Sequence, residues 1–243
     1  MVTRSRLAVA PVLAILCACG RVGPPPNIDS ALASRVPPNT TALAGVNLDQ
    51  LRASPLYAKL PPGAQSLLTP FDKAHEVLVA STGTQLLVIA RGEVTGATVP
   101  APGIALYGAP DLIAAGTTAH APAGILSLAE SVAAGHSVWI ALRGGATLPL
   151  EGNAANLNNL LRAAESVTIT IRPDDPAGID ITAQCPTPES AQRWEQTVRA
   201  LSSLAAATNS RAALDSLAIS RTDRVVHVAV RAPLSALAGA FGR

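Results

Sequence analysis

Residues 166–185, SVTITIRPDDPAGIDITAQC, alternate apolar and polar side chains on both sides of the turn PDDPAG. A period of two places successive side chains on opposite faces of a strand. The turn supplies the Pro, Asp and Gly residues that short connections use. We therefore expect an antiparallel hairpin of strands 166–172 and 178–185, with the Thr and Arg side chains facing outward. The side chains expected to face inward are Val167, Ile169, Ile171, Ile179, Ile181, Ala183 and Cys185.

A long helix and a second hairpin are expected to follow. Thr187, Pro188 and Glu189 provide a capping hydroxyl, a proline at the first helical position and an acid in the first turn. Residues 217–221 and 225–231 flank Thr222-Asp223 and predict a hairpin, with a closing helix over 234–241. The apolar stripe expected on the long helix consists of Ala191, Trp194, Val198, Leu201 and Ala205.

Residues 135–165 precede the first hairpin and contribute one strand and one helix. The run VWIAL at 138–142 predicts the strand, which Gly144-Gly145 ends. Asn153 is suited to cap the helix. The side chains that this helix would present to a core are Leu157, Leu160, Leu161 and Ala164.

Residues 41–134 show a comparable order of elements. The strands expected there are 41–47, 75–81, 85–91, 104–107 and 112–115, and the helices lie within 48–60, 63–74 and 123–134. Antiparallel hairpins with helices on one face define an α+β fold rather than a doubly wound parallel sheet. We predict that fold, with two halves at 41–134 and 135–243. Their shared element order is compatible with an internal duplication, although residue identity between them is weak.

The first residues have the layout of an export signal. Arg4 and Arg6 precede an apolar run, Leu7–Cys17, that is too short for a stable membrane anchor. Leu16-Cys17-Ala18-Cys19 resembles the lipobox of bacterial lipoproteins, in which a small residue precedes the Cys that becomes the lipidated N-terminus. Cys19 follows the small Ala18, whereas Cys17 follows the bulky Leu16. The prediction is a signal peptide over 1–18, cleavage between Ala18 and Cys19 and lipidation of Cys19; a plain secretory signal or a retained membrane helix are the alternatives.

The lipobox resemblance implies a membrane-anchored protein of the cell envelope. Cys19 would carry a diacylglyceryl group and an N-acyl chain of the palmitate kind, and several such chains hold far more firmly than one. Gly20 stands where an Asp commonly retains lipoproteins in the inner membrane, so the outer membrane facing the periplasm is expected. Residues 19–40 contain five prolines and predict an extended tether. The alternative is an ordered arm packed on the domain.

Composition excludes several classes of function. The chain has 18 Lys and Arg against 16 Asp and Glu, and Arg4 and Arg6 would leave with the signal, so the mature chain is expected to be neutral. Nucleic acid is therefore not an expected partner. Aromatic residues make up only 2% of the chain, which is too few for a base- or sugar-stacking platform. Cys185 would be the one thiol left besides Cys19, so no intramolecular disulfide is expected.

No residue pattern predicts a catalytic, cofactor or metal site. Cys185 lies on an inward position and is expected to be a buried small side chain. The histidines, His75, His120, His136 and His227, lack the spacing of metal ligands, and His227 is expected to face outward. Asp174-Asp175 lies in a turn without the further oxygen ligands of a calcium loop. We expect no cofactor and no catalytic residue.

Residues 36–60, VPPNTTALAGVNLDQLRASPLYAKL, resemble the opening of bacterial surface proteins in which a proline-containing turn leads into a strand and a helix. Those families carry no assigned activity. The sequence therefore favours a lipid-anchored, non-enzymatic protein that binds another envelope protein. A periplasmic binding module for an apolar or lipid ligand is the alternative, and a hydrolase with a site assembled from distant residues is the third hypothesis.

Overall fold

The computed structural model describes residues 28–60, 62–83, 85–146, 157–206 and 215–234. The strands are β1 (Ala42–Asn47), β2 (Lys73–Ser81), β3 (Leu86–Glu93), β4 (Thr98–Ala101), β5 (Ile104–Gly108), β6 (Val138–Arg143), β7 (Ser166–Arg172), β8 (Ala177–Gln184), β9 (Ala218–Thr222) and β10 (Val225–Ala232). The helices are α1 (Ser30–Ala33), α2 (Leu48–Arg52), α3 (Pro55–Ala58), α4 (Pro62–Leu68), the 3-10 helix η1 (Thr69–Phe71), α5 (Pro110–Thr117), α6 (Leu126–Ala133), α7 (Leu157–Arg162) and α8 (Pro188–Ala206). The predicted α+β fold is confirmed.

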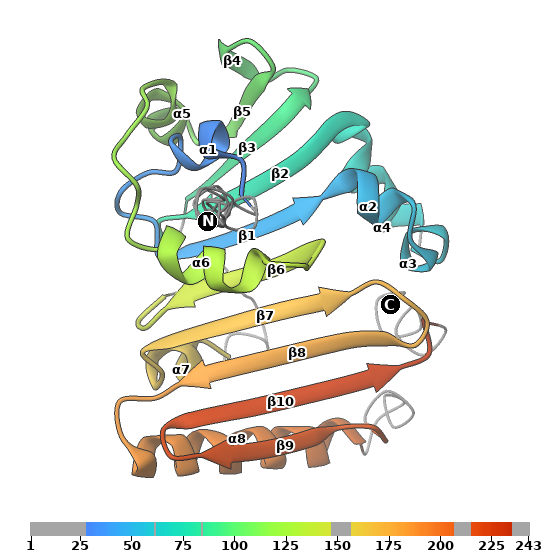
Figure 1. The fold of residues 1–243 in the computed structure, drawn as a ribbon, viewed down its shortest axis with the longest axis vertical. Helices are drawn as coiled ribbons and strands as arrows, with labels where there is room; N and C mark the ends of the chain where they lie inside the picture. Colours follow the sequence, from blue (N-terminus) through green and yellow to red (C-terminus); the bar gives the residue numbers. More distant parts are fainter. Residues whose placement is uncertain (1–27, 61, 84, 147–156, 207–214, 235–243) are drawn as a thin grey trace, which may run out of the picture.

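The ten strands of the described residues form one antiparallel sheet, in the order β4-β5-β3-β2-β1-β6-β7-β8-β10-β9 (Figure 1). β1 pairs with β2 on one side and with β6 on the other, so the β1–β6 pair joins the two halves. Counted outward from that pair, each half has its strands in the order first, second, third, fifth, fourth. The shared topology extends the similarity that the order of elements along the chain suggests.

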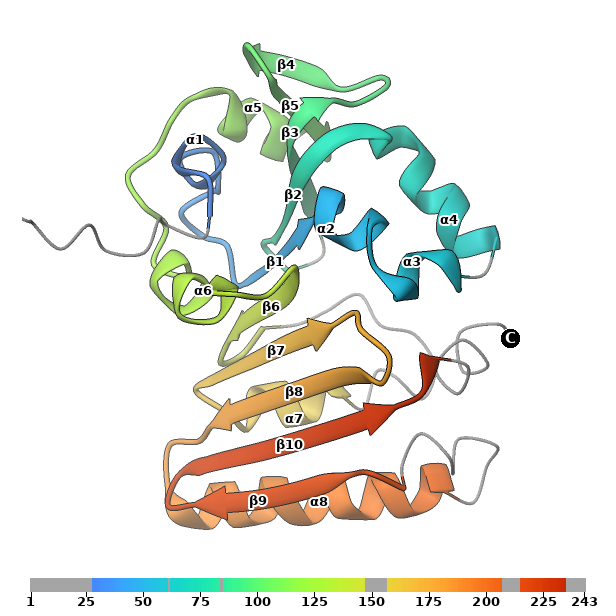
Figure 2. The same ribbon diagram turned by 45° about the vertical axis from the view of Figure 1, so that its right-hand side comes forward.

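Helices cover the two faces of this sheet unequally. Face A, which carries Leu43, Leu78 and Ile89, is covered by α1 and α5 in the first half. Helix α6 covers the same face at the junction of the two halves, where it lies over β1, β6 and β7. Face B, which carries Val46 and Val77, is covered by α2–α4 in the first half and by α7 and α8 in the second (Figure 2). The prediction of helices on one face thus describes only the outer strands of the second half, β8, β10 and β9, whereas the first half and the junction have helices on both faces.

The hairpin predicted over residues 166–185 is present. β7 and β8 pair from Ser166↔Gln184 to Arg172↔Gly178, and the partly buried Ile169 and Ile181 pack into the face-B core with Val167 and Ala183. The hairpin of β9 and β10 is likewise present. The closing helix predicted over 234–241 lies almost entirely outside the described residues, as does the helix-capping Asn153.

Two predictions are wrong in the first half. Residues 112–115 are part of helix α5 rather than a strand, because Pro110 occupies the first helical turn and Leu112 turns inward onto face A. A four-residue apolar run does not distinguish helix from strand by itself. The strand that pairs with β5 on the outer edge is β4, which the sequence did not predict.

Residues 28–40 belong to the folded body rather than to the predicted tether. Ile28, Leu32 and Val36 are almost completely buried in the face-A core. Asp29 caps α1 by accepting the Ala31 N–H at 2.8 Å, and its carboxylate pairs with Arg91 on β3. This part of the chain is therefore the ordered arm of the alternative hypothesis, and residues 19–27 lie outside the described residues.

Candidate functional site: a groove between α7 and α8

The start of α8 is fixed by side-chain hydrogen bonds. The Thr187 hydroxyl accepts the Ser190 N–H at 3.2 Å, and the Ser190 hydroxyl accepts the Thr187 N–H at 3.0 Å. This reciprocal capping satisfies two backbone groups that a helix end would otherwise leave unpaired. The helix start predicted at Thr187-Pro188-Glu189 is confirmed, and it sets the orientation of the side chains that follow.

One side of α8 packs on face B beside α7. Ala191 and Trp194 are buried, and Leu160 and Leu161 of α7 enter the same core. The indole Nε1–H of Trp194 donates to the backbone oxygen of Leu160 at 3.2 Å. Trp194 therefore contributes apolar area and also ties the two helices together.

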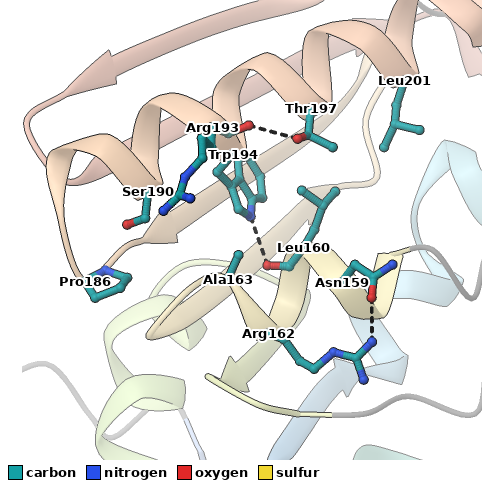
Figure 3. A pocket seen from close by; sticks show the side chains of 10 residues that line it. All are labelled: Asn159, Leu160, Arg162, Ala163, Pro186, Ser190, Arg193, Trp194, Thr197 and Leu201. Carbon is teal, nitrogen blue, oxygen red and sulfur yellow. Dashed lines mark hydrogen bonds between the residues drawn. The ribbon is translucent and has the colours of Figure 1, made fainter.

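A groove of about 610 Å³ runs between these two helices (Figure 3). Its apolar lining includes Leu160, Ala163, Trp194 and Leu201, and its polar lining includes the two arginines Arg162 and Arg193. Leu201 is one of the large apolar side chains that the described surface exposes, at 36%. The groove is thus an apolar depression with guanidinium groups beside it.

Positive charge predominates around the groove. Arg162 donates to Asn159 Oδ1 at 2.5 Å, and neither Arg162 nor Arg193 forms an ion pair with a carboxylate among the described residues. The pKa of Glu189 is lowered by a backbone N–H, then by Thr187, and in smaller part by the charge of Arg193. Both guanidinium groups remain able to bind an acidic group of a partner.

The predicted lipidation site is not part of this geometry. Ala18 and Cys19 both lie outside the described residues. Among the residues that the structure does describe, none of the helices combines the length and apolar character needed to cross a membrane.

Cys185 is buried as expected. Its burial raises the pKa of the thiol, and the nearby negative charge of Glu165 raises it further. A protonated, inaccessible thiol is a poor nucleophile, so the structure gives Cys185 a packing role.

The four histidines lie apart, each with its own partner. His75 Nδ1 lies 2.9 Å from Asp49, His120 Nε2 lies 2.6 Å from the Ala115 oxygen, and His227 Nδ1 lies 3.2 Å from the Thr182 hydroxyl. His136 Nδ1 donates to the Val132 oxygen at 3.0 Å. In the described part of the chain, no three His, Cys, Asp or Glu side chains are grouped to hold a metal.

The Asp174-Asp175 turn has a structural role. One oxygen of Asp175 accepts the Leu234 N–H at 3.2 Å, and the other pairs with Lys59 at 3.2 Å. The hydrogen bonds that the Leu234 N–H and Lys59 donate lower the pKa of Asp175. The turn therefore connects the β7–β8 hairpin with α3 and with the end of β10.

The groove itself was missed from the sequence. The apolar stripe of α8 was predicted and includes Trp194 and Leu201. The stripe pattern does not show that α7 lies beside α8 rather than over it, so it cannot distinguish a filled contact from a groove. The nearest signal was Arg193 directly before Trp194.

Comparison with known proteins supports the fold. No protein-family profile and no curated protein matches the chain. Among solved structures it is similar to crystal forms I and III of TP0453, with a TM-score of 0.52 for both and identities of 8% and 7%. The likeness covers 88% and 86% of this chain and 96% of each TP0453 chain. At such identities it shows a shared fold alone.

Proposed function

We propose that this chain is a lipid-anchored, non-enzymatic protein of the cell envelope that binds another envelope protein through the α7–α8 groove. The envelope location rests on the lipobox resemblance at Cys19, and Gly20 favours the outer membrane facing the periplasm. The binding role rests on the groove, with its apolar lining and two arginines free of carboxylate partners among the described residues.

The groove also indicates the chemistry of the partner. A groove between two helices suits a segment that inserts a few apolar side chains, as amphipathic helices do. Arg162 and Arg193 suit carboxylates at the edges of that segment. The expected partner surface is therefore an apolar stripe flanked by Asp or Glu.

The anchor is tested by mass spectrometry of the mature N-terminus. The wild-type chain should begin at an acylated Cys19, and Cys19→Ala should abolish both the acylation and the membrane association. An unmodified wild-type N-terminus at another position would refute the anchor without bearing on the groove.

The groove is tested by photo-crosslinking in intact envelopes. A photoreactive residue replaces Thr197, which lines the groove, and the matched control replaces Thr182, on face A of β8. A defined adduct should form from position 197 alone, and Arg162→Glu with Arg193→Glu should reduce it. Arg224→Glu, an exposed change at the β9–β10 turn, should not. Equal adducts from both positions, or an adduct unaffected by the groove variants, would contradict the proposal.

An apolar or lipid ligand is the second candidate, favoured by the volume of the groove. Small-molecule sites typically enclose about 300–1,000 Å³, and the groove falls in that range. Native mass spectrometry of the purified protein would then show a co-purified apolar compound. Ala163→Trp, which fills the groove from the residue directly after α7, should remove it.

A further inference from the structure

A second, polar hollow lies at the junction of the two halves, where β1 ends and β6 begins. It measures about 210 Å³ and is lined by Asn47, Gln50, Glu76, His136 and Trp139, among others. A neighbouring hollow of about 360 Å³ shares Gln50 and His136 with it. The side chains come from β1, α2, β2, β6 and the turn after α6, so only the folded sheet brings them together.

Trp139 contributes an unpaired donor to this hollow. The side chain is 3% exposed and lies against Gly45 of the neighbouring strand. No described residue accepts a hydrogen bond from its Nε1–H, in contrast to Trp194, which donates to Leu160. Arg35 Nε is the one fully enclosed and unpartnered side-chain nitrogen in the described part, so the Trp139 nitrogen keeps accessible surface. This N–H therefore faces the hollow without a protein acceptor and is free to donate to a bound group.

The amides beside Trp139 add further donors. Asn47 Oδ1 accepts the Gln50 N–H at 2.9 Å, which leaves the Asn47 amide nitrogen facing no described acceptor. The Gln50 side-chain amide also has no partner among the described residues. One edge of the hollow therefore offers several N–H groups, which suit an anionic oxygen.

Two acceptors line the same hollow. His136 Nδ1 lies 3.0 Å from the carbonyl oxygens of Val132 and Ala134, which only accept, so this nitrogen carries the hydrogen. In the neutral ring, Nε2 then has a free lone pair. The second acceptor is the Glu76 carboxylate, to which the Asp29 backbone donates a hydrogen bond.

The surroundings of Glu76 favour a cationic neighbour. Burial raises the pKa of its carboxyl, and the negative charge of Asp29 raises it further, while the positive charge of Arg91 lowers it in part. A positively charged group in the hollow would offset the cost of holding this carboxylate away from water.

We propose that this hollow binds an α-amino acid unit, either free or at the amino end of a short peptide. The ammonium group contacts Glu76 and His136 Nε2, and the carboxylate or first carbonyl accepts hydrogen bonds from Trp139 and the amides. The hollow measures about 210 Å³, which is room for a small polar group. A unit the size of alanine fits, and the neighbouring hollow takes the continuation of a peptide.

The two tryptophans make the proposal directly testable. Protein labelled at the indole nitrogens gives two resonances, one from Trp139 in the hollow and one from Trp194 in the α7–α8 groove. Titration uses alanine, ethylamine (which lacks the carboxylate), propionate (which lacks the ammonium) and trialanine. Alanine or trialanine should shift the Trp139 resonance saturably, and ethylamine and propionate should bind more weakly. The Trp194 resonance should stay in place, which separates this site from the groove.

Variants identify the ammonium contact. Glu76→Gln keeps an acceptor for the Asp29 N–H and removes the charge, so it should weaken binding at least about tenfold. Glu130→Gln, an exposed acid on α6 outside the hollow, should leave binding unchanged. An unchanged Trp194 resonance verifies that both variants fold. The proposal is wrong if neither alanine nor trialanine shifts the Trp139 resonance, if propionate shifts it as strongly as they do, or if Glu76→Gln binds as wild type.

Discussion

The two halves of the sheet share a strand order and differ in how they are covered. In the first half, α1 and α5 cover face A, α6 covers it at the junction, and the strands there carry buried side chains such as Leu78 and Ile89. In the second half, Trp139 and Ala141 of β6 are still buried on face A, whereas the positions farther from the junction are polar, among them Thr168, Thr182 and His227. The alternation along each strand therefore records whether a helix layer lies above it.

Polar contacts hold the part of face A in the second half that α6 does not cover. Asp180 on β8 pairs with Arg172 at 3.1 Å and with Arg231 on β10 at 2.8 Å. His227 on β10 contacts the Thr182 hydroxyl at 3.2 Å. Contacts of this kind at partly exposed positions contribute little individually, so the stability of the second half is expected to come from face B, under α7 and α8.

The largest expected loss of stability comes from truncating a buried side chain on the covered part of face A. Leu78→Ala removes a fully buried side chain from the face-A core and should cost about 2–5 kcal/mol of unfolding free energy. Thr168→Ala, on face A of the second half, should change it by less than about 0.5 kcal/mol. Denaturant unfolding measures both variants. Equal losses would show that Thr168 is covered as fully as Leu78.

The next largest loss of stability is expected at the β1–β6 pair, where the two halves join. A Cβ on Gly45 would overlap the indole of Trp139 across the β1–β6 pair, so Gly45→Ala should destabilise by about 1–3 kcal/mol. Gly63→Ala on α4 is the control, because a Cβ there meets nothing within 4 Å. That change should stabilise by about 0.4–1 kcal/mol. A Gly45→Ala protein as stable as wild type would mean that Trp139 moves freely, which its burial argues against.

The accuracy of the predictions from sequence also differs between the two halves. The hairpins at 166–185 and 217–231 were predicted because one face of each is open, which makes the alternation clean. In the first half, β3 has helices on both faces, so its run LLVIA shows no alternation that identifies either layer. Residues 112–115 were assigned to a strand because a four-residue apolar run does not distinguish helix from strand by itself. The polar hollow joins Asn47, Glu76 and His136 across long stretches of sequence, and no local pattern connects them.

A smaller change in stability is expected at the N-termini of two helices, α8 in the second half and α5 in the first. α8 begins with the reciprocal Thr187 and Ser190 hydrogen bonds, whereas the N-cap residue of α5, Ala109, makes no side-chain capping bond. Thr187→Ala should therefore cost about 1 kcal/mol, and Ala109→Ser should gain up to about that amount. Thermal unfolding of the two single variants checks both signs. A loss on Ala109→Ser would show that packing of Ala109 against the face-A core outweighs the new cap.

The smallest effect concerns a charge under the covered face. The pKa of Glu76 is raised by burial and by Asp29, so its carboxyl keeps its proton to higher pH in the folded chain than in the unfolded chain. Between the two pKa values the unfolded chain binds fewer protons, and stability falls as the pH rises through that window. Above it, the full cost of the buried carboxylate is present.

Glu76→Gln should therefore be more stable than wild type at neutral pH, and the difference should vanish below the ordinary carboxyl pKa of 4.5, where both chains are uncharged at this position. Glu130→Gln, on the exposed side of α6, should show no such pH dependence. Denaturant midpoints across the acidic range measure the difference. Saturating alanine should reverse it at neutral pH, because the bound ammonium stabilises the wild-type carboxylate and not the amide. A stability gain that persists at every pH would trace to packing, and the charge at Glu76 would then have no part in it.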